Sequence, residues 1–222
     1  MKDEIHITVV YPAYKDDSDL MLESVRAAKT AFSKYPRLRV SWVCADDVWC
    51  SVRDDAMAKF LETPNSMRLP TTYRRGPMIL GGENLVGQCE TFVKAAKETN
   101  ADIIAKMDCD TQLFNADWIE EFADNKKALC GGAFDFGYGN HISVFGGCYL
   151  LRSSVLDSLL EDVKKYPAHH KAWEDHEVSS RIFRISGGDM DVLMRWRSGL
   201  ADLFLSIPLR EANDTLVGAL RK

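Results

Sequence analysis

The chain has 222 residues, of which 46% are hydrophobic and 27% are charged, and its formal net charge is −5. These values are typical of a soluble globular protein that buries its own core as one domain. The acidic balance argues against a general nucleic-acid-binding protein, and no apolar stretch reaches the about 18 residues that a membrane-spanning helix needs.

The first half of the sequence alternates strand and helix patterns. A nearly continuous apolar run over residues 5–11, ended by Pro12, predicts an interior strand of a parallel sheet. Ser18 or Asp19 is a candidate cap for the first helix. The Pro-, Gly- and Arg-rich stretch 63–82 predicts a loop. The predicted strands are residues 5–11, 38–44 and 102–107, and the predicted helices are 20–34, 54–61 and 84–99.

The second half continues the alternation less regularly. The tail after Gly188 is ambiguous, with a strand around 204–207 and a last helix as candidates. The other predicted elements are a helix over 117–123, a strand over 128–134, a turn over 137–140, a strand over 142–151 interrupted by Gly146-Gly147, and helices over 155–166 and 173–185. This order predicts a doubly wound α/β sheet in one domain.

Polar clusters follow three of the predicted strands. They are Pro12-Ala13-Tyr14, Asp46-Asp47 and Asp108-Cys109-Asp110. In open α/β sheets, ligands bind beyond the carboxyl ends of the strands. The three clusters therefore predict a site along one rim of the sheet, of the kind that a nucleotide diphosphate would need.

The pair Asp108 and Asp110 points most directly to chemistry. Side chains alternate along a strand, so two carboxylates two residues apart should project the same way. Like charges this close repel unless a cation lies between them, and a hard divalent ion such as Mg²⁺ or Mn²⁺ suits carboxylate oxygens. The alternative is an Asp-rich turn that caps the next helix.

Taken in order, these segments resemble a GT-A fold glycosyltransferase, close to the large family-two type that uses nucleotide-diphosphate sugars. The resemblance covers about residues 5–185. The matching segments are Val9 to Tyr14, Val43 to Asp47, Gly82 to Gly87, Ala95 to Asp110 and Trp173 to Glu177. It implies a GT-A-like, Rossmann-like α/β fold with a mixed, mostly parallel sheet flanked by helices. A nucleotide-binding half would span about 1–111 and an acceptor and catalytic half about 112–222.

The resemblance also implies residue roles for a nucleotide-sugar donor, with a UDP-sugar preferred, and a Mn²⁺ or Mg²⁺ ion. Asp110 would bind the metal, and Asp108 would face both the metal and the ribose. Arg74 and Arg75 could reach the phosphates or form a solvated surface pair. Residues expected at the nucleotide are Pro12, Ala13, Tyr14, Asp46, Asp47, Arg75 and Asp108. Gly146 and Gly147 would approach the donor sugar or mark a strand bulge.

A second acidic pair, Glu174-Asp175, follows Trp173. In an inverting transfer to a carbohydrate acceptor, a carboxylate takes the proton of the attacking hydroxyl. The resemblance favours Asp175 as this base, with Glu174 binding acceptor hydroxyls and Trp173 stacking on a sugar ring. The alternative is the ordinary enrichment of acids in a first helical turn.

The sequence departs from the resemblance at the third metal ligand. Many relatives supply a His downstream of the acidic pair, but here no His follows His176. His169 and His170 precede the pair and are better explained as surface residues. The third ligand, if any, is left open.

Two other classes of protein are alternatives. A haloacid-dehalogenase-type phosphatase also uses Asp-x-Asp after a strand, but it needs Thr where this chain has Gln112, and Thr111 comes one residue early. A non-catalytic nucleotide-sugar-binding relative of the same fold is the stronger alternative.

The cysteines and the N-terminus bear on location. The six cysteines lie mostly within apolar runs and show no Cys-x-x-Cys spacing, which indicates reduced, mostly buried thiols. The N-terminal residues lack a signal-peptide apolar region. We therefore expect a cytoplasmic protein with no transmembrane segment, open to peripheral association with a membrane.

Overall fold

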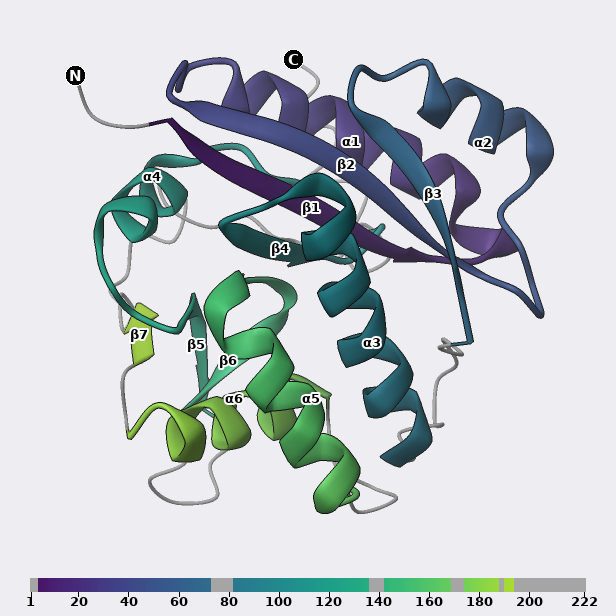
Figure 1. Cartoon of the computed structure of the whole chain (residues 1–222). Helices are drawn as coiled ribbons and strands as arrows, with labels where there is room; N and C mark the ends of the chain where they lie inside the picture. Colours follow the sequence, from purple (N-terminus) through teal and green to yellow (C-terminus); the bar gives the residue numbers. More distant parts are fainter. Residues whose placement is uncertain (1–3, 73–81, 136–141, 169–173, 188–189, 194–222) are drawn as a thin grey trace.

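A single mixed sheet organises the chain. The structure is a computed structural model that describes residues 4–72, 82–135, 142–168, 174–187 and 190–193. Seven strands lie in the order β3-β2-β1-β4-β6-β5-β7 (Figure 1). The strands are β1 (Ile5–Ala13), β2 (Leu38–Asp47), β3 (Ser66–Thr71), β4 (Ile103–Met107), β5 (Leu129–Asp135), β6 (Ile142–Arg152) and β7 (Met190–Leu193). Within the described residues only β6 runs antiparallel to its neighbours, so the predicted mixed, mostly parallel sheet is confirmed.

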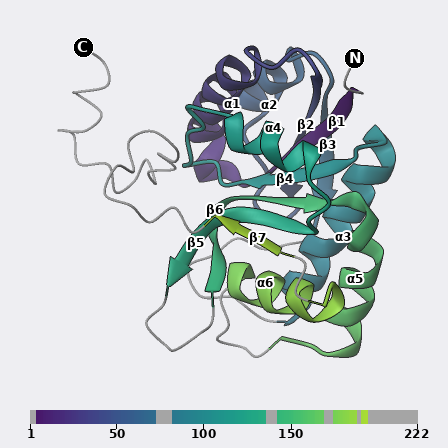
Figure 2. The ribbon, with the colours of Figure 1, turned by 90° about the vertical axis from the view of Figure 1, so that its left-hand side faces the viewer.

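Helices cover both faces of the sheet, as the two turned views show (Figures 1 and 2). The helices are α1 (Ser18–Phe32), α2 (Asp54–Leu61), α3 (Gly82–Thr99), α4 (Asp117–Asp124), α5 (Leu156–Lys165) and α6 (Glu174–Ile185), with short 3-10 helices at Lys15–Asp17 and Ser153–Val155. Buried residues of α1, α2 and α4 form one core with the sheet, and those of α3, α5 and α6 form the other. None of the helices in the described part has the length and apolar character needed to cross a bilayer.

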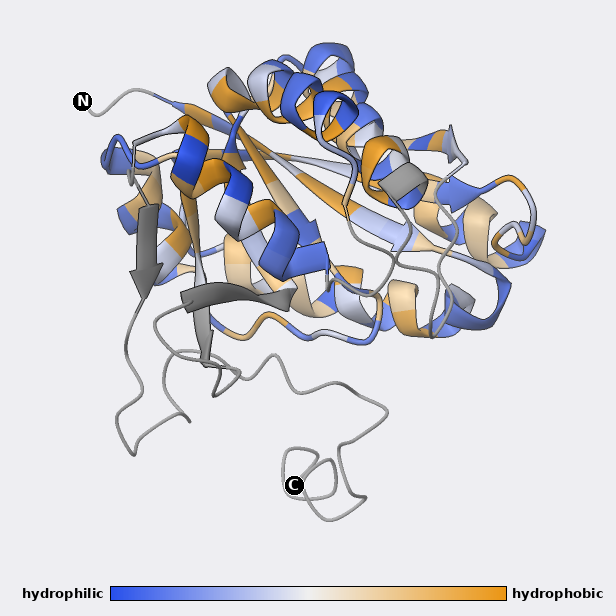
Figure 3. Ribbon diagram, turned by 90° about the horizontal axis from the view of Figure 1, so that it is seen from below, coloured by the Kyte–Doolittle hydropathy of each residue, from blue (hydrophilic) through white to orange (hydrophobic). Residues whose placement is uncertain are grey.

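Alternation along the strands assigns side chains to the two cores. Tyr11 of β1 and Met107 of β4 belong to the α1-α2-α4 core, whereas Val10 and Ile104 belong to the α3-α5-α6 core. Lys106 shares the parity of Ile104, so it faces α3, α5 and α6. Figure 3 shows hydrophobic residues along the central strands, while the helices carry both hydrophobic and hydrophilic residues.

The clearest error of the sequence analysis is the loop predicted over 63–82, because residues 66–71 form β3. This strand pairs only with β2 and contains Pro70 opposite Asp46. Proline is tolerated on an edge strand because no further strand needs its missing N–H group. The short strand β7 lies within the tail that the sequence left ambiguous. The turn predicted over 137–140, the strand around 204–207 and the last helix lie outside the described residues.

Strand β6 differs in detail from its prediction. It runs continuously through Gly146-Gly147, but its pairing with β5 changes register between the pairs Gly131–Tyr149 and Ala133–Val144. The two glycines therefore lie in an irregular stretch of a continuous strand. This stretch lies next to the end of β4, because the Asp108 N–H donates to the Gly147 carbonyl oxygen at 2.9 Å.

Candidate active site

The structure brings the three polar clusters of the sequence to adjacent strand ends. Ala13, near Tyr14, pairs in register with Asp46 of β2. Strand β4 flanks β1 on its other side, and the Cys109 thiol donates to the Pro12 carbonyl oxygen at 3.3 Å. Because β1, β2 and β4 are parallel, their carboxyl ends form one rim, as the sequence predicted.

The acidic pair occupies a turn rather than the end of an extended strand. Strand β4 stops at Met107, and the Thr111 N–H donates to the Asp108 carbonyl oxygen at 3.0 Å. Ser24 of α1 anchors this turn, since its hydroxyl donates to the Thr111 carbonyl oxygen at 2.5 Å. The alternation expected of a strand therefore does not apply to Asp108 and Asp110. Both side chains are partly exposed, and they share one short turn at the rim.

Asp46 and Asp47 are engaged with the protein. The Asp46 side chain is 1% exposed; its Oδ1 accepts from the Val52 N–H at 2.7 Å and its Oδ2 accepts from Arg68. Asp47 is also buried, and its Oδ1 accepts from the Trp49 N–H at 2.8 Å. Together these contacts shape the loop after β2. Hydrogen bonding of either aspartate to a base stays a prediction.

A buried lysine connects the acidic turn to the second acidic pair. The Lys106 side chain is 2% exposed, and its Nζ lies 3.0 Å from Asp108 Oδ1 and 3.4 Å from Glu174 Oε2. The same ammonium lies 5.5 Å from the ring centroid of Tyr149. On the opposite face of the sheet, burial raises the pKa of the Cys148 thiol to about 12, so this thiol stays protonated in the core with Met107.

Glu174 contacts side chains from three other elements. Its Oε1 accepts from Gln88 Nε2 of α3 at 2.6 Å and from the Tyr149 hydroxyl of β6, while Oε2 faces Lys106. Its predicted binding of acceptor hydroxyls stays a prediction, and one that competes with these contacts. Asp175, the next residue, accepts from the His176 N–H with Oδ1 at 2.8 Å, in the first turn of α6.

Sequence analysis missed Lys106, Gln88 and Tyr149. A signal existed for the lysine, because a charged residue within a fully apolar strand must find partners when it is buried. No comparable signal existed for Gln88 and Tyr149, whose roles depend on the packing of α3 against β6. Arg74, Arg75, His169, His170 and Trp173 lie outside the described residues.

The carboxylates of Asp108 and Asp110 suit a hard divalent cation, because both offer oxygen ligands from one turn. Among the described residues, no three His, Cys, Asp or Glu side chains gather into a group that could hold a metal ion. A cation here would thus complete its coordination with water or with phosphate oxygens, as Mg²⁺ commonly does. The residues fit such a shared site.

Neither a protein-family model nor a curated protein matches the sequence. Solved structures do match it. The galactosyltransferase LgtC in complex with donor and acceptor sugar analogs aligns with a TM-score of 0.56 and 10% identity over 83% of this chain and 72% of that chain. A Drosophila β1,4-galactosyltransferase 7 mutant, in complex with manganese, UDP-Gal and xylobiose, aligns with a TM-score of 0.55 and 15% identity over 91% and 71%.

A third match is the mannosyltransferase PcManGT from Pyrobaculum calidifontis in complex with GDP-Man and Mn²⁺, with a TM-score of 0.53 and 16% identity over 84% of this chain and 54% of that chain. At these identities the likeness establishes the fold. The chain has the GT-A fold of nucleotide-sugar glycosyltransferases, as the resemblance of its sequence implied. The phosphatase alternative has no support from these matches.

Proposed function

We propose that this protein is a metal-assisted glycosyltransferase that moves a sugar from a nucleotide-diphosphate donor, a UDP-sugar, to a hydroxyl of a carbohydrate acceptor with inversion. One observation carries the proposal. In a glycosyltransferase fold, the Asp108–Asp110 turn lies at the carboxyl end of β4, beside the end of β1. Solved structures of the same fold contain UDP-Gal or GDP-Man together with manganese.

The donor nucleotide would lie across the rim formed by β1 and β2. Pro12, Ala13 and Tyr14 would line the base pocket, and Asp47 at the end of β2 would contact the base. Asp46 would act by holding the loop after β2, because both of its oxygens already accept hydrogen bonds. Arg75 would reach the phosphates from the segment after β3.

Asp110 and Asp108 would hold Mn²⁺ or Mg²⁺ together with the donor pyrophosphate. When bound, such an ion neutralises charge that develops on the leaving diphosphate. The structure supports this assignment through the chemistry of the ligands, two carboxylates of one turn. The ammonium of Lys106 lies 3.0 Å from Asp108 Oδ1 and so limits the net charge beside this carboxylate.

Asp175 would act as the general base. As the acceptor oxygen attacks the anomeric carbon, its proton passes to the Asp175 carboxylate and the bond from the anomeric carbon to the diphosphate oxygen breaks. Gly146, Gly147 and Trp173 would contact the donor and acceptor sugars. In support, Gly147 lies against Asp108, and the start of α6 lies against Lys106.

The proposal is tested in two measurements on the whole chain. A thermal-shift screen of UDP, GDP and their sugars, each with and without Mn²⁺, should show a rise in melting temperature that needs both nucleotide and metal, because a ligand of the folded state stabilises it by mass action. Hydrolysis of the stabilising nucleotide sugar should then release the nucleoside diphosphate and the free sugar. Stabilisation without turnover, in the presence of carbohydrate acceptors, would favour the non-catalytic binding protein. No stabilisation by any nucleotide would overturn the proposal.

A further inference from the structure

The buried ammonium of Lys106 pairs with carboxylates of both the Asp108 turn and α6. Asp108 follows the end of β4 and Glu174 begins α6, so the lysine bridges two acids that are 66 residues apart in sequence. A lysine that is 2% exposed must be compensated by charge and hydrogen bonds, because burial of an isolated ammonium costs several kcal/mol.

The contacts of Glu174 show what the lysine holds in place. Three donors converge on its carboxylate: Gln88 from α3, Tyr149 from β6 and Lys106 from β4. Glu174 is the first residue of α6, so these contacts fix where the helix begins. The next residue is Asp175, the base of the proposed reaction, whose place relative to the donor follows from the start of the helix.

We propose that Lys106 is a positioning residue: by pairing with Glu174 and Asp108 at once, it holds the first turn of α6, and with it Asp175, at a fixed place relative to the metal-binding turn. The inference rests on the proposed function of this site. Without the ammonium, the two carboxylates would lose the cation that they share, and their like charges would repel. The start of α6 would move away from the donor, and alignment of the base with the anomeric carbon would be lost, which slows chemistry more than binding.

The charge of the lysine gives the proposal a signature that simple structural damage does not share. A cation beside Asp108 disfavours a second cation on the same carboxylate. Lys106→Met should therefore leave Mn²⁺-dependent binding of UDP as strong as in the unaltered protein, or a few-fold stronger. At a nearly constant KM, kcat for hydrolysis of the UDP-sugar should fall about tenfold or more. One power of ten corresponds to about 1.4 kcal/mol of activation free energy. General disruption of the site would weaken UDP binding instead.

The test combines Lys106→Met, Glu174→Gln and the double variant, with calorimetric binding of UDP and Mn²⁺ (GDP where UDP does not bind) and steady-state hydrolysis. Because Lys106 acts through Glu174, the double variant should be no slower than Lys106→Met alone, as contacting residues that form one unit are not additive. Glu174→Gln keeps the buried ammonium and should by itself lower kcat with KM little changed. Lys97→Met is the matched control, since Lys97 of α3 forms an exposed ion pair with Asp157.

The outcomes separate the two proposals. Suppose that the unaltered protein binds UDP or GDP with Mn²⁺ and hydrolyses the nucleotide sugar. The role of Lys106 alone is then overturned by any of three results: Lys106→Met weakens nucleotide binding, it leaves kcat unchanged, or its loss of kcat adds to that of Glu174→Gln in the double variant. Should Lys106→Met fail to fold, an unaltered kcat in Glu174→Gln overturns it equally. If the unaltered protein neither binds nor hydrolyses, the proposed function fails and this role with it.

Discussion

Arg68 of β3 donates from Nε to Oδ2 of Asp46 in β2 at 2.7 Å, and its Nη2 lies 2.5 Å from the same oxygen. The other oxygen of Asp46 accepts from the Val52 N–H. One buried carboxylate thus ties the edge strand to the loop that leaves β2 at the rim. This loop also contacts the segment after β1, because the Lys15 N–H donates to the Cys50 carbonyl oxygen at 2.9 Å.

Replacement of Asp46 should therefore reduce stability as well as any nucleotide binding. Asp46→Ala leaves the buried Val52 N–H without its acceptor and Arg68 without its partner, so we expect the free energy of unfolding to fall by about 1–3 kcal/mol. Urea denaturation measures it. Asp55→Ala is the control, because Asp55 pairs with Arg53 at an exposed site and its loss should change stability little. Equal stability of the two variants would contradict the structural role of Asp46.

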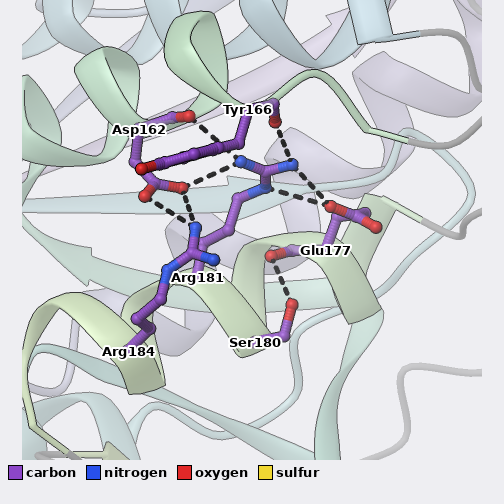
Figure 4. A network of polar contacts seen from close by, with 6 residues as sticks. All are labelled: Asp162, Tyr166, Glu177, Ser180, Arg181 and Arg184. Atoms are coloured by element: carbon purple, nitrogen blue, oxygen red, sulfur yellow. Dashed lines mark hydrogen bonds and ion pairs between the residues drawn. The ribbon is translucent and has the colours of Figure 1, made fainter.

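A second polar network fixes α6 against α5 (Figure 4). Arg181 is 6% exposed; its Nη1 donates to Asp162 Oδ2 at 2.8 Å, and Nε and Nη2 donate to Glu177 Oε2. Its Nη2 also donates to the Tyr166 carbonyl oxygen at 2.7 Å. Arg184 reaches the same Asp162 from the surface, where it is 57% exposed. The two arginines thus share one carboxylate but differ in burial.

Their replacement should have unequal effects. Arg181→Met leaves the partly buried acids Asp162 and Glu177 poorly compensated and should lower the free energy of unfolding by about 3 kcal/mol. Arg184→Met removes an exposed pair and should cost less than about 1 kcal/mol. Chemical denaturation of both variants decides the matter, and a cost for Arg184→Met that equals or exceeds that of Arg181→Met would show that burial does not govern this network.

How far the sequence predicts this fold depends on how local each signal is. The apolar runs of β1, β2 and β4 and the helix at 54–61 are encoded by their own residues, and their predicted bounds lie within two or three residues of the observed ones. Strand β3 was missed because Pro70 and Arg68 are typical of loops. Residues 66–71 form a strand because they pair with β2 on one side and because Arg68 contacts Asp46 of β2.

The candidate site divides in the same way. Parallel strands bring their carboxyl ends to one edge, so the meeting of Pro12, Asp46 and Asp108 follows from the order of elements. The turn at Asp108 and the contacts of Glu174 depend on side chains from α1, α3 and β6, whose positions no local pattern specifies. Glu174 is an example: the local sequence predicts an acid at the start of a helix, but it does not predict the contact with the buried Lys106.

The six thiols provide a measurement that involves no ligand. Cys50 is exposed in the loop after β2, whereas the other five cysteines are buried and free. Burial also raises the pKa of the Cys89 and Cys148 thiols to about 12, so at pH 8 they remain unreactive thiols. Ellman's reagent should thus modify one thiol in the folded protein and six in denaturant, and Cys50→Ser should abolish the fast reaction. Reaction of two or more thiols before unfolding would contradict the described core.

The acidic turn can be tested at Asp110. If it binds the metal, Asp110→Asn should remove most of the Mn²⁺-dependent stabilisation by UDP, because a carboxylate ligand with full charge is replaced by a neutral amide. The melting temperature without ligand should change little, since Asp110 is partly exposed. Thermal shifts at several Mn²⁺ concentrations measure this. Stabilisation by UDP and Mn²⁺ that equals that of the unaltered protein would exclude Asp110 as a ligand.

The base is tested most sharply by Asp175→Asn. The amide oxygen of asparagine can still accept from the His176 N–H, so the start of α6 should persist, but the side chain can no longer take a proton. We expect UDP–Mn²⁺ affinity within about twofold of the original and kcat lower by about 100-fold or more, the usual range for loss of a general base. Glu177→Gln controls for loss of charge in the same helical turn, because Glu177 contacts Arg181 at the α5–α6 contact instead of Lys106. Normal turnover in Asp175→Asn would show that another group is the general base. A loss of UDP binding would show that Asp175 contacts the donor rather than the acceptor.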